Sequence, residues 1–214
     1  MKKTISVLLS VLIAISVFSI GAFAAETEPT KFEKWISNHE VDNELAVKLN
    51  VRAGGYLMGF IKADAYFKGD NFAMTIDFNG REIKMVAEDD DLLIFLTKIP
   101  FMHYRMKAED VFGSENMDFS DFSFDREYEL VIEERTFWVE EYTFESDGEK
   151  YQMSAYFEGD ELKKITVVQN IADMDVELEF EILSYEVDDK MFKMPFISID
   201  VTFLVDILLK FGLL

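Results

Sequence analysis

The chain contains no cysteine and only three prolines among its 214 residues. Without cysteine we expect no disulfide, no thiol nucleophile and no lipid carried on a cysteine after a signal peptide. The shortage of proline, together with 14% aromatic residues and 21 phenylalanines, is not the composition of a disordered chain. The sequence therefore predicts a folded protein with much apolar surface to bury.

Basic residues are also scarce. The chain has 21 Lys and Arg against 42 Asp and Glu, which gives a formal net charge of −21. Nucleic acids and anionic membrane surfaces repel a chain of this charge, so we expect no nucleic-acid partner. The charge favours solubility, cationic partners or the avoidance of self-association.

The first 24 residues have the three parts of a secretory signal peptide. Lys2 and Lys3 form a basic start, residues 5–21 are apolar, and Ala22 and Ala24 stand at the small-residue positions before a cleavage site. An uncleaved anchor is the alternative, because the apolar stretch is long. We predict cleavage before Ala25 and a secreted, periplasmic or cell-envelope location. The remaining 190 residues then carry a charge of −23 and suffice for one domain with a core.

Residues 30–39 carry the signals of a short helix. Thr30 and Glu33 fit a capping box, in which each side chain bonds the other residue's backbone N–H. Phe32, Trp35 and Ile36 recur on one helical face, which we expect to dock on a sheet.

From Glu44 onward the apolar period changes from 3.6 to 2, and turn residues such as Asn79-Gly80 separate the segments. We expect nine to eleven strands with a long irregular connection over 107–126. The fold class is mainly β (α+β): one strongly curved antiparallel sheet or a half-open barrel, with an N-terminal helix and an apolar C-terminal helix. The expected strands cover 44–51, 56–67, 72–78, 81–87, 92–97, 101–106, 128–144, 151–158, 162–169 and 173–184.

The tail, residues 196–214, follows the domain at 25–195 and is strongly apolar, with polar residues at Thr202, Asp206 and Lys210. We predict a helix over about 199–211 that folds back to plug or line the cavity, with these three residues outward. Charged residues interrupt this apolar stretch, which is barely long enough to cross a membrane. We therefore expect no transmembrane span after signal cleavage. A partner or a membrane is the alternative contact for the tail.

The segment from Glu149 to Pro195 ends in the string S-Y-E-V-D-D-K-M-F-K-M-P. It resembles the end of the periplasmic lipoprotein-carrier proteins, the LolA-like superfamily. The resemblance implies a half-open antiparallel barrel around helices, with a concave apolar face that holds acyl chains. The tail after Pro195 is an addition to that pattern, and no basic residue stands out as a lid.

No catalytic motif is recognisable, and we expect neither an enzyme nor a cofactor. His39 and His103 lack partner ligands at metal-binding spacing. The acidic runs at 88–91 and at Asp118, Asp121 and Asp125 do not match a calcium loop, so the fold should not depend on calcium.

Aromatic residues crowd the expected strands, either as ordinary core or as the lining of a pocket. We favour an exported module that binds a lipid or other apolar ligand within the curved sheet. The alternative is an exported structural or interaction protein with a filled core, acting through the acidic face of the strand at 173–183. The candidate lining residues are Phe60, Phe67, Phe72, Phe95, Trp138, Phe157 and Phe180.

Overall fold

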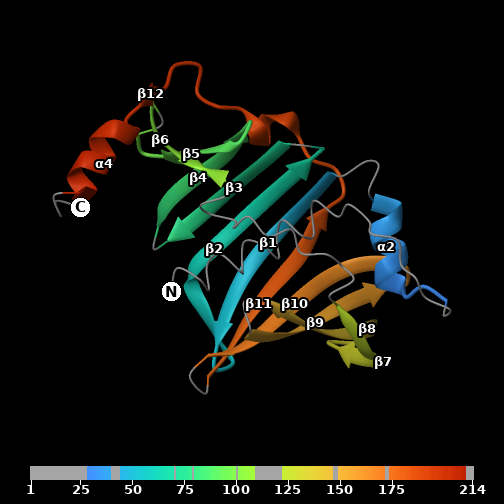
Figure 1. Ribbon diagram of the computed structural model, residues 1–214. Coiled ribbons are helices and arrows are strands. Elements are labelled where there is room, and N and C mark those ends of the chain that lie inside the picture. The colour runs from blue at the N-terminus through green and yellow to red at the C-terminus, as the bar shows by residue number, and fades with distance from the viewer. Residues whose placement is uncertain are drawn as a thin grey trace.

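Twelve strands form one continuous, open sheet in the computed structural model (Figure 1). The structure describes residues 28–39, 44–69, 71–78, 80–99, 101–108, 122–146, 149–171 and 174–210. The first six strands are β1 (Glu44–Ala53), β2 (Tyr56–Lys68), β3 (Asn71–Phe78), β4 (Arg81–Glu88), β5 (Asp91–Leu96) and β6 (Met102–Lys107). The others are β7 (Ser123–Ile132), β8 (Arg135–Ser146), β9 (Glu149–Glu158), β10 (Glu161–Ile171), β11 (Met174–Ser184) and β12 (Ile199–Asp200). The helices are α2 (Lys31–His39), the 3-10 turn η2 (Asp189–Phe192) and α4 (Thr202–Lys210).

The strand order is β12-β6-β5-β4-β3-β2-β1-β11-β10-β9-β8-β7. Strands β1 to β6 and β7 to β11 are two antiparallel meanders, and the pairing of β1 with β11 joins them. Only β12 departs from this pattern, because it pairs with β6 in parallel. The prediction of a single curved antiparallel sheet is confirmed, and the sheet stays open. The expected count of nine to eleven strands is too low.

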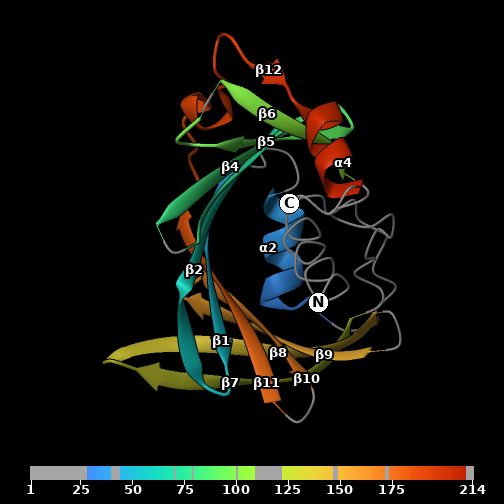
Figure 2. The same cartoon turned by 90° about the vertical axis from the view of Figure 1, so that its left-hand side faces the viewer.

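The sheet curves strongly, and α2 lies on its concave side (Figure 2). The main core forms between this helix and the sheet. Phe32 and Ile36 from the helix pack with Phe67 of β2, Ile165 of β10 and Phe180 of β11. The helix at 30–39 and its capping box are confirmed. The Thr30 N–H donates to Glu33 Oε2 at 2.7 Å, and the Glu33 N–H donates to Thr30 Oγ1 at 3.1 Å.

A second, smaller cluster lies on the convex face. Val86 and Phe95 are its centre, and Phe192 of η2 packs against them. These residues alternate along β4 and β5 with side chains of the main core, as the pleat of a strand requires. The chain after β11 thus crosses to the outside of the sheet and covers part of it.

The strand expected at 128–144 is wrong. The structure has a hairpin there, with β7 and β8 joined at Glu133 and Glu134, whose φ angles are 49° and 67°. A two-residue hairpin loop of type I′ needs positive φ at both central positions, and Asn-Gly or Asp-Gly usually supplies it. Two glutamates carry no such signal. Most of the expected connection over 107–126 lies outside the described residues, but its last part belongs to β7.

The tail forms the predicted helix, α4, but not the predicted plug. It lies beside β6 at the edge of the sheet, where Thr202 Oγ1 accepts the Arg105 N–H at 2.8 Å and Asp206 accepts the Tyr104 hydroxyl at 3.1 Å. Thr202 is half-buried against β6, so the prediction that it points outward is wrong, whereas Asp206 and Lys210 are exposed as predicted. Phe203 and Leu204 are also exposed. Residues 1–24, the expected signal peptide, lie outside the described part of the chain.

Candidate functional site

The concave face of the sheet carries one buried carboxylate, Glu140 of β8. It shares this face with Trp138, Tyr142 and Phe144, because residues two apart on a strand point the same way. Glu140 Oε1 accepts the Lys31 N–H at 2.8 Å, and Oε2 accepts the Phe32 N–H at 2.9 Å and the Tyr142 hydroxyl at 3.0 Å.

These bonds make Glu140 an anchor for helix α2. The first N–H groups of a helix have no partner within it and carry partial positive charge, so a carboxylate there is well placed. The Thr30 and Tyr142 hydroxyls are 2.8 Å apart, and because Tyr142 donates its one proton to Glu140, Thr30 is the donor between them. Burial raises the pKa of Tyr142. Every Glu140 bond is explained by docking of the helix, so this carboxylate is structural and is not a free catalytic acid.

Apolar side chains cover the concave face well beyond the helix. From β10 to β6 the sheet runs through seven strand spacings of about 4.8 Å, a breadth of about 34 Å. A helix is about 10 Å wide, which corresponds to about two of those spacings. Helix α2 lies near the β8–β10 side (Figures 1 and 2), whereas Met74 and Leu92 continue the same core on β3 and β5.

The structure brings together most of the predicted lining residues. Phe67, Phe72, Phe157 and Phe180 belong to the main core, and Trp138 packs against it half-buried. Phe60 lies on β2, but its side chain is outside what the structure describes.

Phe95 is the exception among the predicted lining residues, because it cannot line the concave face. It is buried in the convex cluster, with its ring 5.5 Å from that of His103. The run Leu92–Leu96 is apolar at every position, so alternation could not assign its faces.

Two polar atoms on the concave face have no hydrogen-bond partner within the described residues. They are Nε1 of Trp138 and Oε1 of Gln169, and both atoms are buried. Gln169 shares its face with Ile165 and Val167 of β10, two members of the main core. A buried indole N–H or amide oxygen is normally paired, because leaving it unpaired is costly. The face is thus largely apolar with two unsatisfied polar atoms, one a donor and one an acceptor.

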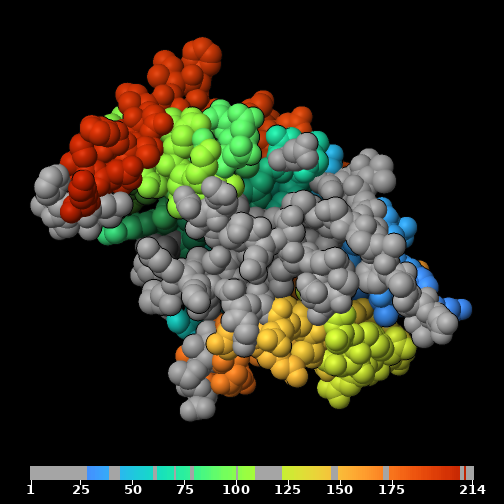
Figure 3. Space-filling model, in the orientation of Figure 1, coloured from blue at the N-terminus to red at the C-terminus, as the bar shows by residue number. Residues whose placement is uncertain are grey.

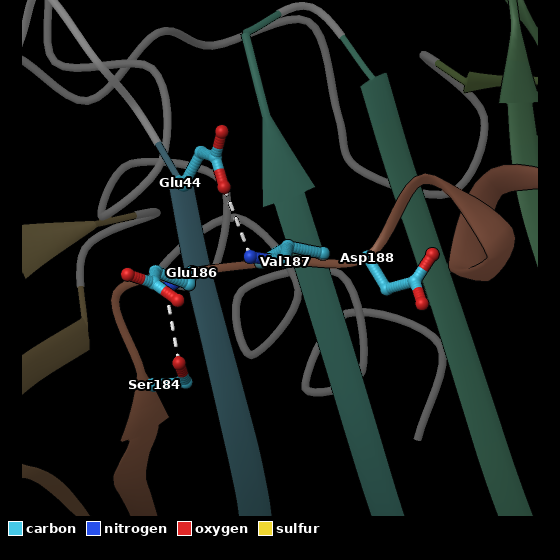
Figure 4. A pocket seen from close by; sticks show the side chains of 5 residues that line it. All are labelled: Glu44, Ser184, Glu186, Val187 and Asp188. Carbon is cyan, nitrogen blue, oxygen red and sulfur yellow. Dashed lines mark hydrogen bonds between the residues drawn. The ribbon is translucent and has the colours of Figure 1, made fainter.

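A separate open pocket of about 590 Å³ lies where the chain leaves β11 (Figure 4). Glu44, Ser184, Glu186, Val187 and Asp188 line it. Two hydrogen bonds link its lining residues: the Val187 N–H donates to Glu44 Oε2 at 2.9 Å and the Glu186 N–H donates to Ser184 Oγ at 2.9 Å. The Val187 N–H, followed by Lys68, lowers the pKa of Glu44.

This pocket belongs to the S-Y-E-V-D-D-K-M-F-K-M-P segment, whose residues have structural roles. The Tyr185 hydroxyl donates to the Leu162 carbonyl at 2.8 Å, and Asp188 accepts the Lys190 N–H at the start of η2. Asp189 pairs with Lys68 at 2.8 Å, and Phe192 enters the convex cluster. The segment carries the chain from one face of the sheet to the other. The side chains named here are used in contacts within the protein.

The acidic face of β11 is matched by basic residues on both neighbouring strands. Glu179 is close to Arg52 of β1 at 3.9 Å and to Lys164 of β10 at 3.3 Å. Glu177 and Glu181 lie 3.9 and 3.8 Å from Arg52 and Lys48. The ladder is therefore largely compensated within the sheet, and alternation along the strand, which was predicted, is confirmed by the buried Leu178 and Phe180.

His103 lies beside one carboxylate. His103 is buried, and its Nε2 lies 3.8 Å from Asp200 Oδ2, while the side chain of His39 is not described. Among the described residues no three metal-ligating side chains converge. In the acidic run at 88–91, Asp91 pairs with Lys107 and Arg105, which lower its pKa. Asp118 and Asp121 fall outside the described chain. The described helices include none with the length and apolar character needed to cross a bilayer.

Comparison with known proteins identifies no family. No family model and no curated protein sequence matches the chain. Among solved structures, PNGF-II aligns with a TM-score of 0.36 and 8% identity over 78% of this chain, but over only 33% of its own length. A Vibrio parahaemolyticus domain described as an outer membrane lipoprotein-sorting protein domain aligns with a TM-score of 0.24 and 11% identity, over 70% of this chain and 88% of its own. The second description matches the family that the C-terminal string resembles, but likeness at these scores carries no argument about function.

Sequence reasoning named Trp138 as a lining residue, but it missed Glu140 and Gln169 and the unpaired state of the Trp138 N–H. Glu140 could have been found, because alternation places it among Trp138, Tyr142 and Phe144. The unpaired atoms of Trp138 and Gln169 could not have been found from the sequence, because hydrogen bonding depends on neighbours that only the folded sheet brings close.

Proposed function

We propose that this protein binds an apolar ligand, such as an acyl chain, on the concave face of its sheet. The observation that carries the proposal is the breadth of the apolar concave face, about 34 Å, compared with the single described helix upon it. Ligand sites in proteins are mostly apolar and hold a few polar groups that orient the ligand. The concave face has this composition.

The two unpaired atoms indicate that the ligand carries a polar group as well as an apolar chain. Trp138 Nε1 is a donor and Gln169 Oε1 is an acceptor. The register of β8, β9 and β10 places Trp138 and Gln169 at opposite ends of these strands, so a carbonyl, hydroxyl or amide beside an apolar chain would satisfy one of the two atoms. A pure hydrocarbon would satisfy neither, so we infer an amphiphile such as a fatty acid or an acylated molecule.

The acidic face of β11 supports the alternative function, binding of a partner protein, less well. Glu177, Glu179 and Glu181 already lie beside Lys and Arg side chains of this chain. A cationic partner would have to compete with those contacts.

We also propose that the protein acts outside the cytoplasm, on the basis of residues 1–24. N-terminal sequencing of the exported protein should begin at Ala25. Recovery of Met1 in the exported fraction would show that the segment is not removed.

Native mass spectrometry of protein purified without detergent gives the first test of ligand binding. We expect adducts with the masses of lipids, which organic extraction removes. Extracted protein should then bind a fluorescent fatty acid. A clean protein mass with no fatty-acid uptake would overturn the proposal and identify a filled core.

A matched pair of variants on β2 locates the site. Ala65 is buried on the concave face, and Lys62, three residues earlier, is exposed on the other face. Ala65→Phe should lower fatty-acid affinity at least ~10-fold by filling the concave face, whereas Lys62→Phe should leave it unchanged. Thermal melting of both proteins checks that each is folded.

The tryptophans offer a readout of ligand position, because the chain has only two. Trp138→Phe replaces the indole by a smaller aromatic ring without the N–H donor, so we expect affinity to fall by about 2- to 10-fold. Trp35→Phe is the control, since Trp35 Nε1 already donates to the Tyr185 hydroxyl. The change in tryptophan fluorescence on binding should disappear in Trp138→Phe and persist in Trp35→Phe.

A further inference from the structure

Three segments meet at one end of the molecule: the turn between β5 and β6, residues 194–199, and α4. The Ile199 N–H donates to the Phe101 carbonyl at 2.8 Å, which joins the second segment to the first. Helix α4 follows directly and lies against β6 through Thr202 and Asp206. The C-terminal segment stands out there in the space-filling view (Figure 3).

Large apolar side chains are exposed at this end. Phe196 is 102% exposed, Ile197 70% and Phe203 78%. We call the group the apolar end, and its members are Ile99, Phe101, Phe196, Ile197, Phe203 and Leu204. Scattered exposed apolar residues are ordinary, but a group gathered from three segments marks an interaction surface.

The apolar end also differs in charge from the rest of the chain. Asp and Glu make up 42 of 214 residues, yet the stretches 92–108 and 190–199 contain none. Lys98 and Lys193 lie within these stretches and are exposed. The nearest acidic groups on the tail, Asp200 and Asp206, are turned toward Arg105 and Tyr104 of β6.

We propose that the apolar end docks on the surface of a phospholipid membrane, with its aromatic and aliphatic side chains in the interface and its lysines at the phosphates. Aromatic residues and lysines together suit a membrane interface, where one part of the site is apolar and the other is anionic. This docking does not depend on a ligand bound to the concave face.

The acidic residues of strand β11 do not prevent this contact. The acidic strand β11 lies seven strand spacings from β12, about 34 Å along the sheet. The Debye length is about 8 Å at physiological salt, so those charges are largely screened at the membrane.

A second copy of the chain is a poorer occupant. The net charge of −21 repels copies of the chain from one another.

Vesicle flotation of the chain from residue 25 tests this proposal. Vesicles of equal parts phosphatidylethanolamine and phosphatidylglycerol should carry the protein to the top of the gradient. Phe196→Ser with Ile197→Ser should lower the bound-to-free ratio at least ~10-fold, because two large apolar contacts are lost. Tyr56→Ser with Leu57→Ser removes two exposed apolar residues at the β1–β2 turn and should have no effect.

A charge variant distinguishes this contact from non-specific hydrophobic adsorption to vesicles. Lys98→Glu with Lys193→Glu should weaken flotation strongly at low salt and less at high salt. The proposal is overturned if the parent chain does not float, or if both serine doubles reduce flotation equally. It is also overturned if sedimentation shows a dimer that Phe196→Ser with Ile197→Ser dissociates, since the end would then be an interface between copies.

Discussion

Helices α2 and α4 are both nine residues long, but α2 packs into the core and α4 lies exposed at the edge of the sheet. The sequence of α2, KFEKWISNH, is the more polar, yet its Phe32 is 0% exposed. The sequence of α4, TFLVDILLK, is far more apolar, yet its Phe203 is 78% exposed. Polar anchors decide the difference: Glu140 holds the start of α2 against the concave face, whereas Thr202 and Asp206 hold α4 by its polar side. Hydrophobicity alone does not determine which helix enters a core.

The second residue of each helix gives the strongest test. Phe32→Ala should lower the free energy of unfolding by about 3–5 kcal/mol, because it empties a fully buried site. Phe203→Ala should change it by less than about 0.5 kcal/mol. Urea denaturation measures both. Equal losses would mean that α4 contributes to the core as α2 does.

The anchor of α2 comes next in expected effect. Glu140→Ala leaves the Lys31 and Phe32 N–H groups and the Tyr142 hydroxyl without their acceptor, and we expect a loss of about 3 kcal/mol. The neighbouring Glu141 points to the other face and pairs with Arg126, so Glu141→Ala should cost about 1 kcal/mol or less. A small effect of Glu140→Ala would show that packing, not the anchor, holds α2.

The threonines at the starts of the two helices should act on different scales. Thr30→Ala removes a cap of α2 and should lower global stability by about 1 kcal/mol. Thr202→Ala removes the acceptor of the Arg105 N–H and should speed amide hydrogen exchange in α4 while the urea midpoint stays nearly constant. A shift of the urea midpoint with Thr202→Ala would place α4 in the cooperative core.

Acid should loosen α4 over a limited pH range. Hydrogen bonds from the Thr202 side chain and backbone, with help from His103 and Arg105, lower the pKa of Asp200 below its usual 3.8. A carboxyl whose folded pKa is depressed contributes stability above the unfolded pKa, and loses it as pH falls through the folded pKa. NMR signals of α4 should thus stay unchanged from neutral pH to about 4 and shift below that value. In Asp200→Asn this shift should be absent, and its persistence would assign the effect to another group.

The sequence predicted α2 well because all its signals are local. Thr30 and Glu33 stand three residues apart and bond each other as expected. Strand β11 was equally clear, since Leu178 and Phe180 alternate with glutamates. The position of the tail was predicted wrongly, because Thr202 and Asp206 bond to partners on β6, about 100 residues earlier, which no local pattern reveals.

The candidate site was predicted only in part. Alternation placed Phe67 and Phe180 on one face, but it could not orient Phe95 within a run of apolar residues. The hairpin at Glu133 and Glu134 carries no turn residues, so β7 and β8 merged into one expected strand. These failures share a cause, which is that the deciding contacts are made across the sheet.

The junction of β1 with β11 has a consequence for how the protein is made. Every other antiparallel pair joins strands that are consecutive in the chain, but Asn50 and Glu179 meet across 129 positions. A growing chain emerges at about 5–20 residues per second, so β1 keeps one edge open for on the order of ten seconds. Closing so long a loop is also a slow step, because its entropy is lost before the contacts form. A β11 peptide added during refolding should compete for the edge, and an unchanged yield would show that the junction closes early. Until the β1–β11 junction closes, the edge of β1 can pair with strands of other chains. A chaperone that shields β1 would act mainly in that interval.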